Sequence, residues 1–383
     1  MVTQDPFEQI AQRLQRDGVE AACETLIDQL RAGEQYHHLF DARLMLARHQ
    51  LGLPLAANPS MDQLSEAVRD RLENAYLEAC REVGELLLRQ GQLRQAWMYL
   101  RPADAAPRMR EALQQQDPTD DTVDQWIEVA IYEGVAPARG FDLLLNHHGT
   151  CNAITTYDST MHGRSKEEQQ EVAGLLVRWL HGELLQNLAG DGAADAASGA
   201  MPVLDWLGKL DQPLGPYTVH IDVSHLGSVV RFARVVTDPE TVRLAWDLAE
   251  YGSRLDDGLQ PGGDPPFANC FPAHRLFFAA QSGQHVDEAV EYFRQQAEAA
   301  DVRTETTAAV EVYVELLARL GRFQEAIDAY VGWIPESVPT TGLAPSLLEL
   351  SRRAGDYSQL IHWSRQRDDL LGFAVACLEQ DGK

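Results

Sequence analysis

The sequence predicts an all-helical fold built from antiparallel helical hairpins, and three observations support this prediction. Gly321 and Gly355 lie 34 residues apart, and each is followed by an aromatic residue two positions later, a spacing typical of helix–turn–helix repeats. Apolar residues recur at helical spacing through most of the chain. The one stretch that alternates like a strand, 219–223, is too short to outweigh the helical pattern.

The amino-terminal elements follow from apolar spacing and from glycine. A first helix is expected over 6–31, with a break at Gly18. A second is expected over 34–51 and closed by Gly52, because glycine favours a helix end. A third is expected to begin after Ser60. Each of these segments is long enough to bury one apolar face against a neighbour.

A short sequence motif recurs where helical hairpins are expected to turn. It begins with glycine and places a small residue five or six positions later, as in Gly321 with Ala326. Two antiparallel helices approach closely only where side chains are small, which explains the alanine. The other copies begin at Gly91 (Ala96), Gly283 (Ala289) and Gly355, where Leu360 replaces the alanine.

The central segment carries its own helix signals. Pro137 suits the first turn of a helix that stops at Gly149. Ser165 and Glu168 form a capping box that opens a helix to about residue 188. A Gly/Ala-rich stretch follows, and further loops are expected at 256–266 and 335–345. The expected organisation is a helical array over 1–188, a flexible linker or exposed loop over 189–218, and helical repeats over 219–383.

The repeated motif resembles the motif of tetratricopeptide repeats. The match is best over 305–335, fair over 85–100 and 283–293, and weakest over 350–365. The resemblance implies an α-solenoid, a right-handed superhelix of helical hairpins whose concave groove binds a protein or peptide partner. The segment 130–235 departs from the repeat pattern.

Composition narrows the classes of partner. The net charge of −26 disfavours nucleic acid and anionic membranes and favours a basic protein segment. The five cysteines form no Cys-x-x-Cys pair, which argues against a disulfide framework and for a reducing compartment. No signal peptide or membrane-spanning run is apparent, so a cytoplasmic location is expected.

Polar clusters in and near the irregular centre suggest a second hypothesis, a metal-dependent enzyme or metal-binding protein. Imidazole and carboxylate ligands suit zinc, iron or manganese. The candidate ligands are His147, His148, His220, Asp222 and His225, with His37, Asp41 and Cys151 as possible additions. Each also has a structural interpretation: Asp222 can cap a helix, and the paired histidines can bind the carbonyls at a helix end. No catalytic residue is assigned, and whether the chain is an enzyme stays open.

Overall fold

The computed structural model describes residues 5–55, 64–190, 203–208, 212–302, 306–335 and 338–382. Within these ranges the chain is helical, and strand pairing is limited to two isolated bridges, Leu214 with Leu255 and Gly262 with Asn269. The predicted all-helical class is therefore confirmed. The chain forms two compact units, Met1–Ala153 and Ile154–Lys383.

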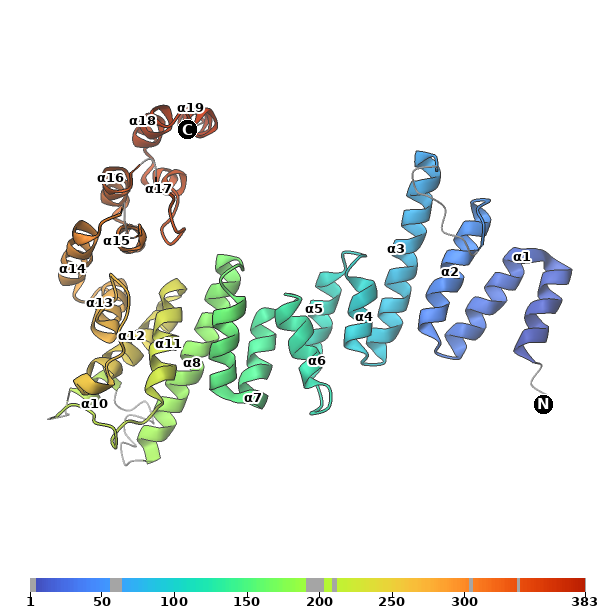
Figure 1. Ribbon diagram of the computed structural model, residues 1–383, viewed down its shortest axis with the longest axis horizontal. Coiled ribbons are helices and arrows are strands. Elements are labelled where there is room, and N and C mark those ends of the chain that lie inside the picture. Colours follow the sequence, from blue (N-terminus) through green and yellow to red (C-terminus); the bar gives the residue numbers. More distant parts are fainter. Residues whose placement is uncertain are drawn as a thin grey trace. The chain divides into compact units, whose positions relative to one another are not determined.

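The amino-terminal unit is a succession of helices that pack on their neighbours in sequence, in particular α1 on α2, α2 on α3 and α3 on α4. They can be followed from blue to green in Figure 1. The helices are α1 (Pro6–Ala32), α2 (Tyr36–Gln50), α3 (Glu66–Arg89), α4 (Leu93–Leu100), α5 (Ala106–Gln115), α6 (Val123–Ile127), a π-helical turn (Glu128–Tyr132) and the first part of α7 (Pro137–Thr160).

The carboxyl-terminal unit continues the pattern of neighbour packing. Helix α11 contacts α8, α12 and α13, and the pairs from α13–α14 to α16–α17 pack in order. The helices are α8 (Lys166–Gly190), α10 (Val203–Leu207), α11 (Val223–Phe232), α12 (Pro239–Ser253), α13 (Cys270–Gln281), α14 (Val286–Ala299), α15 (Ala308–Arg319), α16 (Phe323–Trp333), α17 (Leu347–Ala354), α18 (Ser358–Gln366) and α19 (Leu370–Asp381). Short 3₁₀ turns occupy Ala233–Val235 and Asp257–Leu259.

All four copies of the repeated motif form the turn that the sequence predicts. Gly91, Gly283, Gly321 and Gly355 have φ between 72° and 77°, the left-handed region that glycine enters without strain. Each lies between two consecutive helices. The small residues behind these turns are buried: Ala96, Ala289 and Ala326 are 0% exposed. The hairpins are thus explained by one glycine that reverses the chain and one alanine that lets two helices meet.

One of the two predicted helix boundaries in the centre is confirmed and the other only in part. Gly149 has φ 80° and breaks the helix where the stop is predicted, but helical turns resume after it and α7 continues to Thr160. Ser165 and Glu168 form the capping box, since each backbone N–H donates to the other's side chain at 3.2 Å. The predicted linker at 189–218 stays a prediction, because 191–202 and 209–211 lie outside the described residues.

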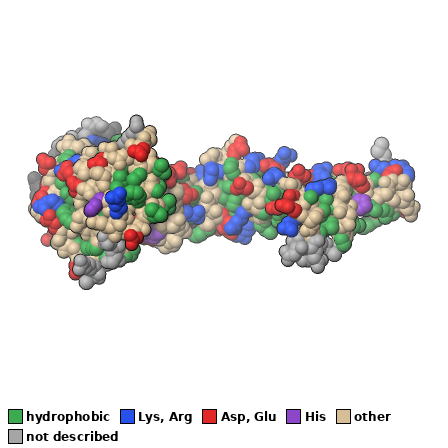
Figure 2. All heavy atoms as spheres, turned by 90° about the horizontal axis from the view of Figure 1, so that it is seen from above, with side chains coloured by type: hydrophobic (Ala, Val, Ile, Leu, Met, Phe, Trp, Pro, Cys, Tyr) green, Lys and Arg blue, Asp and Glu red, His purple; other side chains and the backbone are tan. Residues whose placement is uncertain are grey.

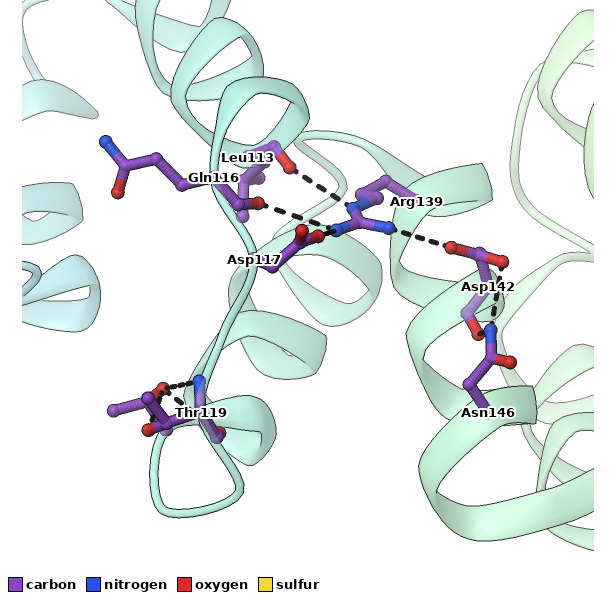
Figure 3. A network of polar contacts seen from close by, with 8 residues as sticks. Leu113, Gln116, Asp117, Thr119, Arg139, Asp142 and Asn146 are labelled. Carbon is purple, nitrogen blue, oxygen red and sulfur yellow. Dashed lines mark hydrogen bonds and ion pairs between the residues drawn. The ribbon is translucent and has the colours of Figure 1, made fainter.

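Arg139 of α7 fastens the loop after α5 within the amino-terminal unit (Figure 3). Its guanidinium donates to the carbonyl oxygens of Leu113 (3.3 Å) and Gln116 (3.5 Å), near the end of α5. It also pairs with Asp117 and, at 2.8 Å, with Asp142. One side chain therefore satisfies carbonyls that a helix end leaves without partners.

Crossing a bilayer requires a long, apolar helix, and none of the helices that the structure describes meets both conditions.

Candidate functional site

The histidines expected as metal ligands precede the break at Gly149 within α7, and their carboxylate neighbours lie on α6 and in the turn before it. His148 Nε2 lies 3.0 Å from Asp124 Oδ1, and His147 Nδ1 lies 3.8 Å from Asp120 Oδ1. The Asp120 side chain is 98% exposed. These contacts are solvent-exposed, and exposed pairs of this kind contribute little to stability.

The cluster at the start of α11 serves the helix. Asp222 Oδ1 accepts hydrogen bonds from the backbone N–H of Ser224 (2.8 Å) and His225 (3.1 Å), so Asp222 is the amino-terminal cap. The hydrogen bond from the Ser224 side chain, together with these N–H groups, lowers the pKa of Asp222. His220 Nδ1 lies 3.0 Å from the Tyr251 hydroxyl rather than beside Asp222.

The additional candidates belong to the amino-terminal unit. His37 has both ring nitrogens occupied, by the Tyr99 hydroxyl (2.8 Å) and by Gln95 Oε1 (3.0 Å). Asp41 lines a shallow pocket beside His38, and Cys151 is exposed. Across the residues that the structure describes, no group of three or more His, Cys, Asp or Glu side chains is placed to hold a metal ion. The metal hypothesis remains a prediction that no described cluster supports.

A two-lobed groove in the carboxyl-terminal unit brings together residues that the sequence did not single out. The first lobe, about 320 Å³, lies among α8, α11, α13, α15 and the loop before α17. The second lobe, about 490 Å³, lies between α11, α13 and the loop 261–267. We call the two lobes together the arginine groove. The lobes meet at five side chains that line both of them: Arg231, Arg234, Phe267, Val312 and Leu343.

The charge of this groove differs from that of the chain. Four cations line it, Lys166, Arg231, Arg234 and Arg319, against two carboxylates, Glu315 and Asp264. On the face drawn in Figure 2, by contrast, acidic and basic side chains are interspersed without a broad patch of one sign. The groove is thus a local cationic site in a protein of net charge −26.

Each arginine of the groove stacks on a phenylalanine. The guanidinium carbon lies 4.8 Å from the ring centroid of Phe232 for Arg231 and 4.9 Å from that of Phe267 for Arg234. Arg319 lies 5.4 Å from the Phe277 ring. Such cation–π contacts hold the guanidinium plane against the ring and leave its N–H edges available for hydrogen bonds.

Among the described residues, Arg234 differs from the other two arginines in forming no salt bridge, although the carboxylate of Asp264 attracts it from farther away and raises its pKa. Arg231 pairs with Asp158 at 3.0 Å and Arg319 pairs with Glu315 at 2.6 Å. Arg234 donates its Nε–H to the carbonyl oxygen of Arg231 at 3.0 Å, and among the described residues it forms no ion pair. Burial and the neighbouring charge of Arg231 lower the pKa of Arg234 to about 10. A desolvated cation with free N–H groups can bind a carboxylate through two parallel hydrogen bonds.

His274 forms part of the wall of the second lobe as a neutral ring. It stacks on Phe267 with ring centroids 4.1 Å apart and is 2% exposed. Nδ1 lies 2.6 Å from the carbonyl oxygen of Cys270, so this nitrogen carries the proton. Burial, reinforced by the charge of Arg234, lowers the pKa of His274 to about 3. His274 therefore adds no positive charge to the groove near neutral pH.

The sequence offered only a weak signal for this groove. Arg231 and Arg234 lie three apart and would share a helix face, but this spacing is common on solvated helices. Phe267 and Arg319 come from segments far along the chain, and only folding brings them beside α11. Comparison with known proteins adds no assignment: no protein-family model, curated protein or solved structure matches the chain significantly.

Proposed function

We propose that the chain is a helical-repeat scaffold, similar in design to tetratricopeptide-repeat proteins, that binds an extended acidic segment of a protein partner in the arginine groove. The observation that carries the proposal is Arg234, a partly buried guanidinium that forms no salt bridge among the described residues and lies where the two lobes meet. Burial of a cation costs free energy unless a partner compensates it, so a ligand carboxylate is the natural complement.

The shape and the lining of the groove support a peptide. Two adjoining lobes suit an extended chain, which can place different side chains in each lobe. Phe267, Val312 and Leu343 offer apolar contact at the junction, beside the cation. An acidic residue flanked by aliphatic or aromatic residues could pair with the guanidinium of Arg234 and pack on the apolar side chains beside it. Aromatic and arginine side chains are also the residues that most often dominate binding energy at interfaces.

The negative charge of the whole chain does not oppose this proposal. At physiological ionic strength the Debye length is about 8 Å, so exposed acids farther away are largely screened. The partly buried groove cations are screened much less. Overall charge predicts a basic partner, whereas the groove favours an acidic one, and short-range interactions dominate inside a cleft.

Binding of defined peptides by the full-length chain tests the proposal. One pool of short, end-blocked, fluorescein-labelled peptides carries a central Asp or Glu flanked by Leu, Phe or Tyr, and a matched pool carries Asn or Gln instead. We expect fluorescence polarisation to show saturable binding of the acidic pool and weaker binding of the amide pool.

Two variants locate the binding. Leu343→Trp fills the junction of the lobes and is expected to weaken binding. The control, Leu378→Trp, adds the same ring at a side chain that is 73% exposed and outside the groove. No binding by the wild-type chain, or equal binding by both variants, would refute the proposal.

A further inference from the structure

One wall of the arginine groove is a loop, residues 338–346, which we call the strap. Thr341, Gly342 and Leu343 of the strap line the first lobe, and Leu343 also lines the second. The strap is attached to α15, which contributes Val312 and Arg319 to the groove. The position of the strap on α15 therefore shapes this part of the site.

A single buried carboxylate fastens the strap to α15. Glu311 is 0% exposed. Its Oε1 accepts hydrogen bonds from Thr341 N (2.6 Å) and Thr341 Oγ1 (3.0 Å). Its Oε2 accepts them from Leu343 N (2.8 Å) and Ala344 N (3.4 Å). Within the described residues, the hydrogen bonds donated by 341–344 all end on Glu311.

The strap is shaped to present its N–H groups to this carboxylate. Gly342 has φ 80°, so the chain reverses between the two amides that bind the two oxygens. At the N-cap position of α15, Thr307 Oγ1 donates to Oε1 at 2.5 Å and adds a further hydrogen bond to the carboxylate. Hydrogen bonds to a charged acceptor are about twice as strong as neutral ones, so Glu311 is a strong attachment of the strap to α15, beside the side-chain hydrogen bond of Thr340 with Tyr330 of α16.

We infer that Glu311 is a positioning residue of the peptide site: by holding the strap on α15 it keeps the groove wall at the separation that a bound segment requires. This inference rests on the proposed function. Glu311 does not touch the ligand, and its effect on binding is transmitted through Thr341 and Leu343. Release of the strap widens the first lobe and removes the apolar contact of Leu343 beside Arg234.

The full-length Glu311→Gln variant tests the inference, because an amide replaces one accepting oxygen by a donor. Hydrogen exchange of strap amides, followed by mass spectrometry, is expected to accelerate by at least about tenfold. Affinity for the acidic peptide pool is expected to fall by a similar factor. Asp247→Asn is the matched control, since it alters another buried carboxylate of the same unit, hydrogen-bonded to His181 at 3.2 Å and outside the groove.

A second variant guards against a folding defect. Gly342→Ala strains the left-handed turn but leaves Glu311 in place, and we expect faster strap exchange and weaker binding from it as well. A loosened strap with unchanged affinity in either variant would overturn the inference, as would unchanged strap exchange in Glu311→Gln. Absence of peptide binding to the wild-type chain would instead refute the proposed function, and the exchange measurement distinguishes the two failures.

Discussion

Replacement of Arg234 by methionine is expected to stabilise the carboxyl-terminal unit while it weakens binding. The physical basis is the desolvation of a cation. The pKa of Arg234 falls from 12.5 to about 10 on folding. At about 1.4 kcal/mol per pKa unit, this shift corresponds to a cost on the order of 3 kcal/mol for the charged form.

Two favourable contacts of Arg234 offset part of this cost. The stack on Phe267 contributes about 1 kcal/mol, and the hydrogen bond to the carbonyl oxygen of Arg231 contributes about 1 kcal/mol. The difference leaves a net gain of about 1 kcal/mol for Arg234→Met, whose unbranched side chain can occupy the same channel. Binding of the acidic peptide pool, in contrast, is expected to weaken by at least about tenfold, because the ligand carboxylate loses its partner.

Urea titration with pulse proteolysis measures the stability of this unit in the full-length chain, through peptides from α11 and α13, and fluorescence polarisation measures affinity. Arg294→Met on α14 is the control, since Arg294 pairs with Glu291 and Glu298 and lies outside the groove. If Arg234→Met lowered the free energy of unfolding by more than about 1 kcal/mol, Arg234 would be a structural residue and the reasoning would be refuted.

The remaining predictions concern single contacts. Burial raises the pKa of Glu311, but the hydrogen bonds to its carboxylate outweigh burial and hold this pKa below 4.5. The stability that ionised Glu311 contributes is therefore present above pH 4.5 and is lost as the pH falls through the folded pKa. Acid titration followed by circular dichroism should accordingly show a shallower loss of folded structure for Glu311→Gln than for the wild-type chain. Arg139→Leu should cost about 2–3 kcal/mol and accelerate hydrogen exchange in the loop after α5; unchanged exchange would contradict the role of Arg139. Gly321→Ala should lower the free energy of unfolding by about 1 kcal/mol, since φ there is 74°; an unchanged urea midpoint would argue against strain. Elemental analysis of chelator-free protein should find substoichiometric metal, unaffected by His147→Ala and His220→Ala; one tightly held ion lost in both variants would favour the metal hypothesis.

Local structure was predictable where one short segment decides it. Glycine after a helix and alanine behind the turn placed the hairpins at Gly91 and Gly321, because left-handed backbone geometry and close helix contact each depend on one residue type. Asp222 is a similar case, since a cap needs only its own side chain and the next turn of backbone.

The candidate metal ligands show that residue type alone does not determine where a side chain lies. His147 and His148 extend towards exposed aspartates, and His220 towards Tyr251, so chemically suitable ligands are drawn to separate neighbours. Sequence spacing cannot show this, because the partners come from other helices or loops.

By itself, then, the sequence determined the helical class, the hairpin turns and their caps, all of which arise from interactions within a few residues along the chain. Only the tertiary structure decided where function could lie. Arg234, Phe267 and Glu311 form the groove and its strap because helix packing brings together segments that are distant in sequence, and packing also removes the water that would otherwise compensate their charge. The four turn glycines allow the chain to reverse between paired helices, and the proposed peptide site depends on the partly buried guanidinium of Arg234.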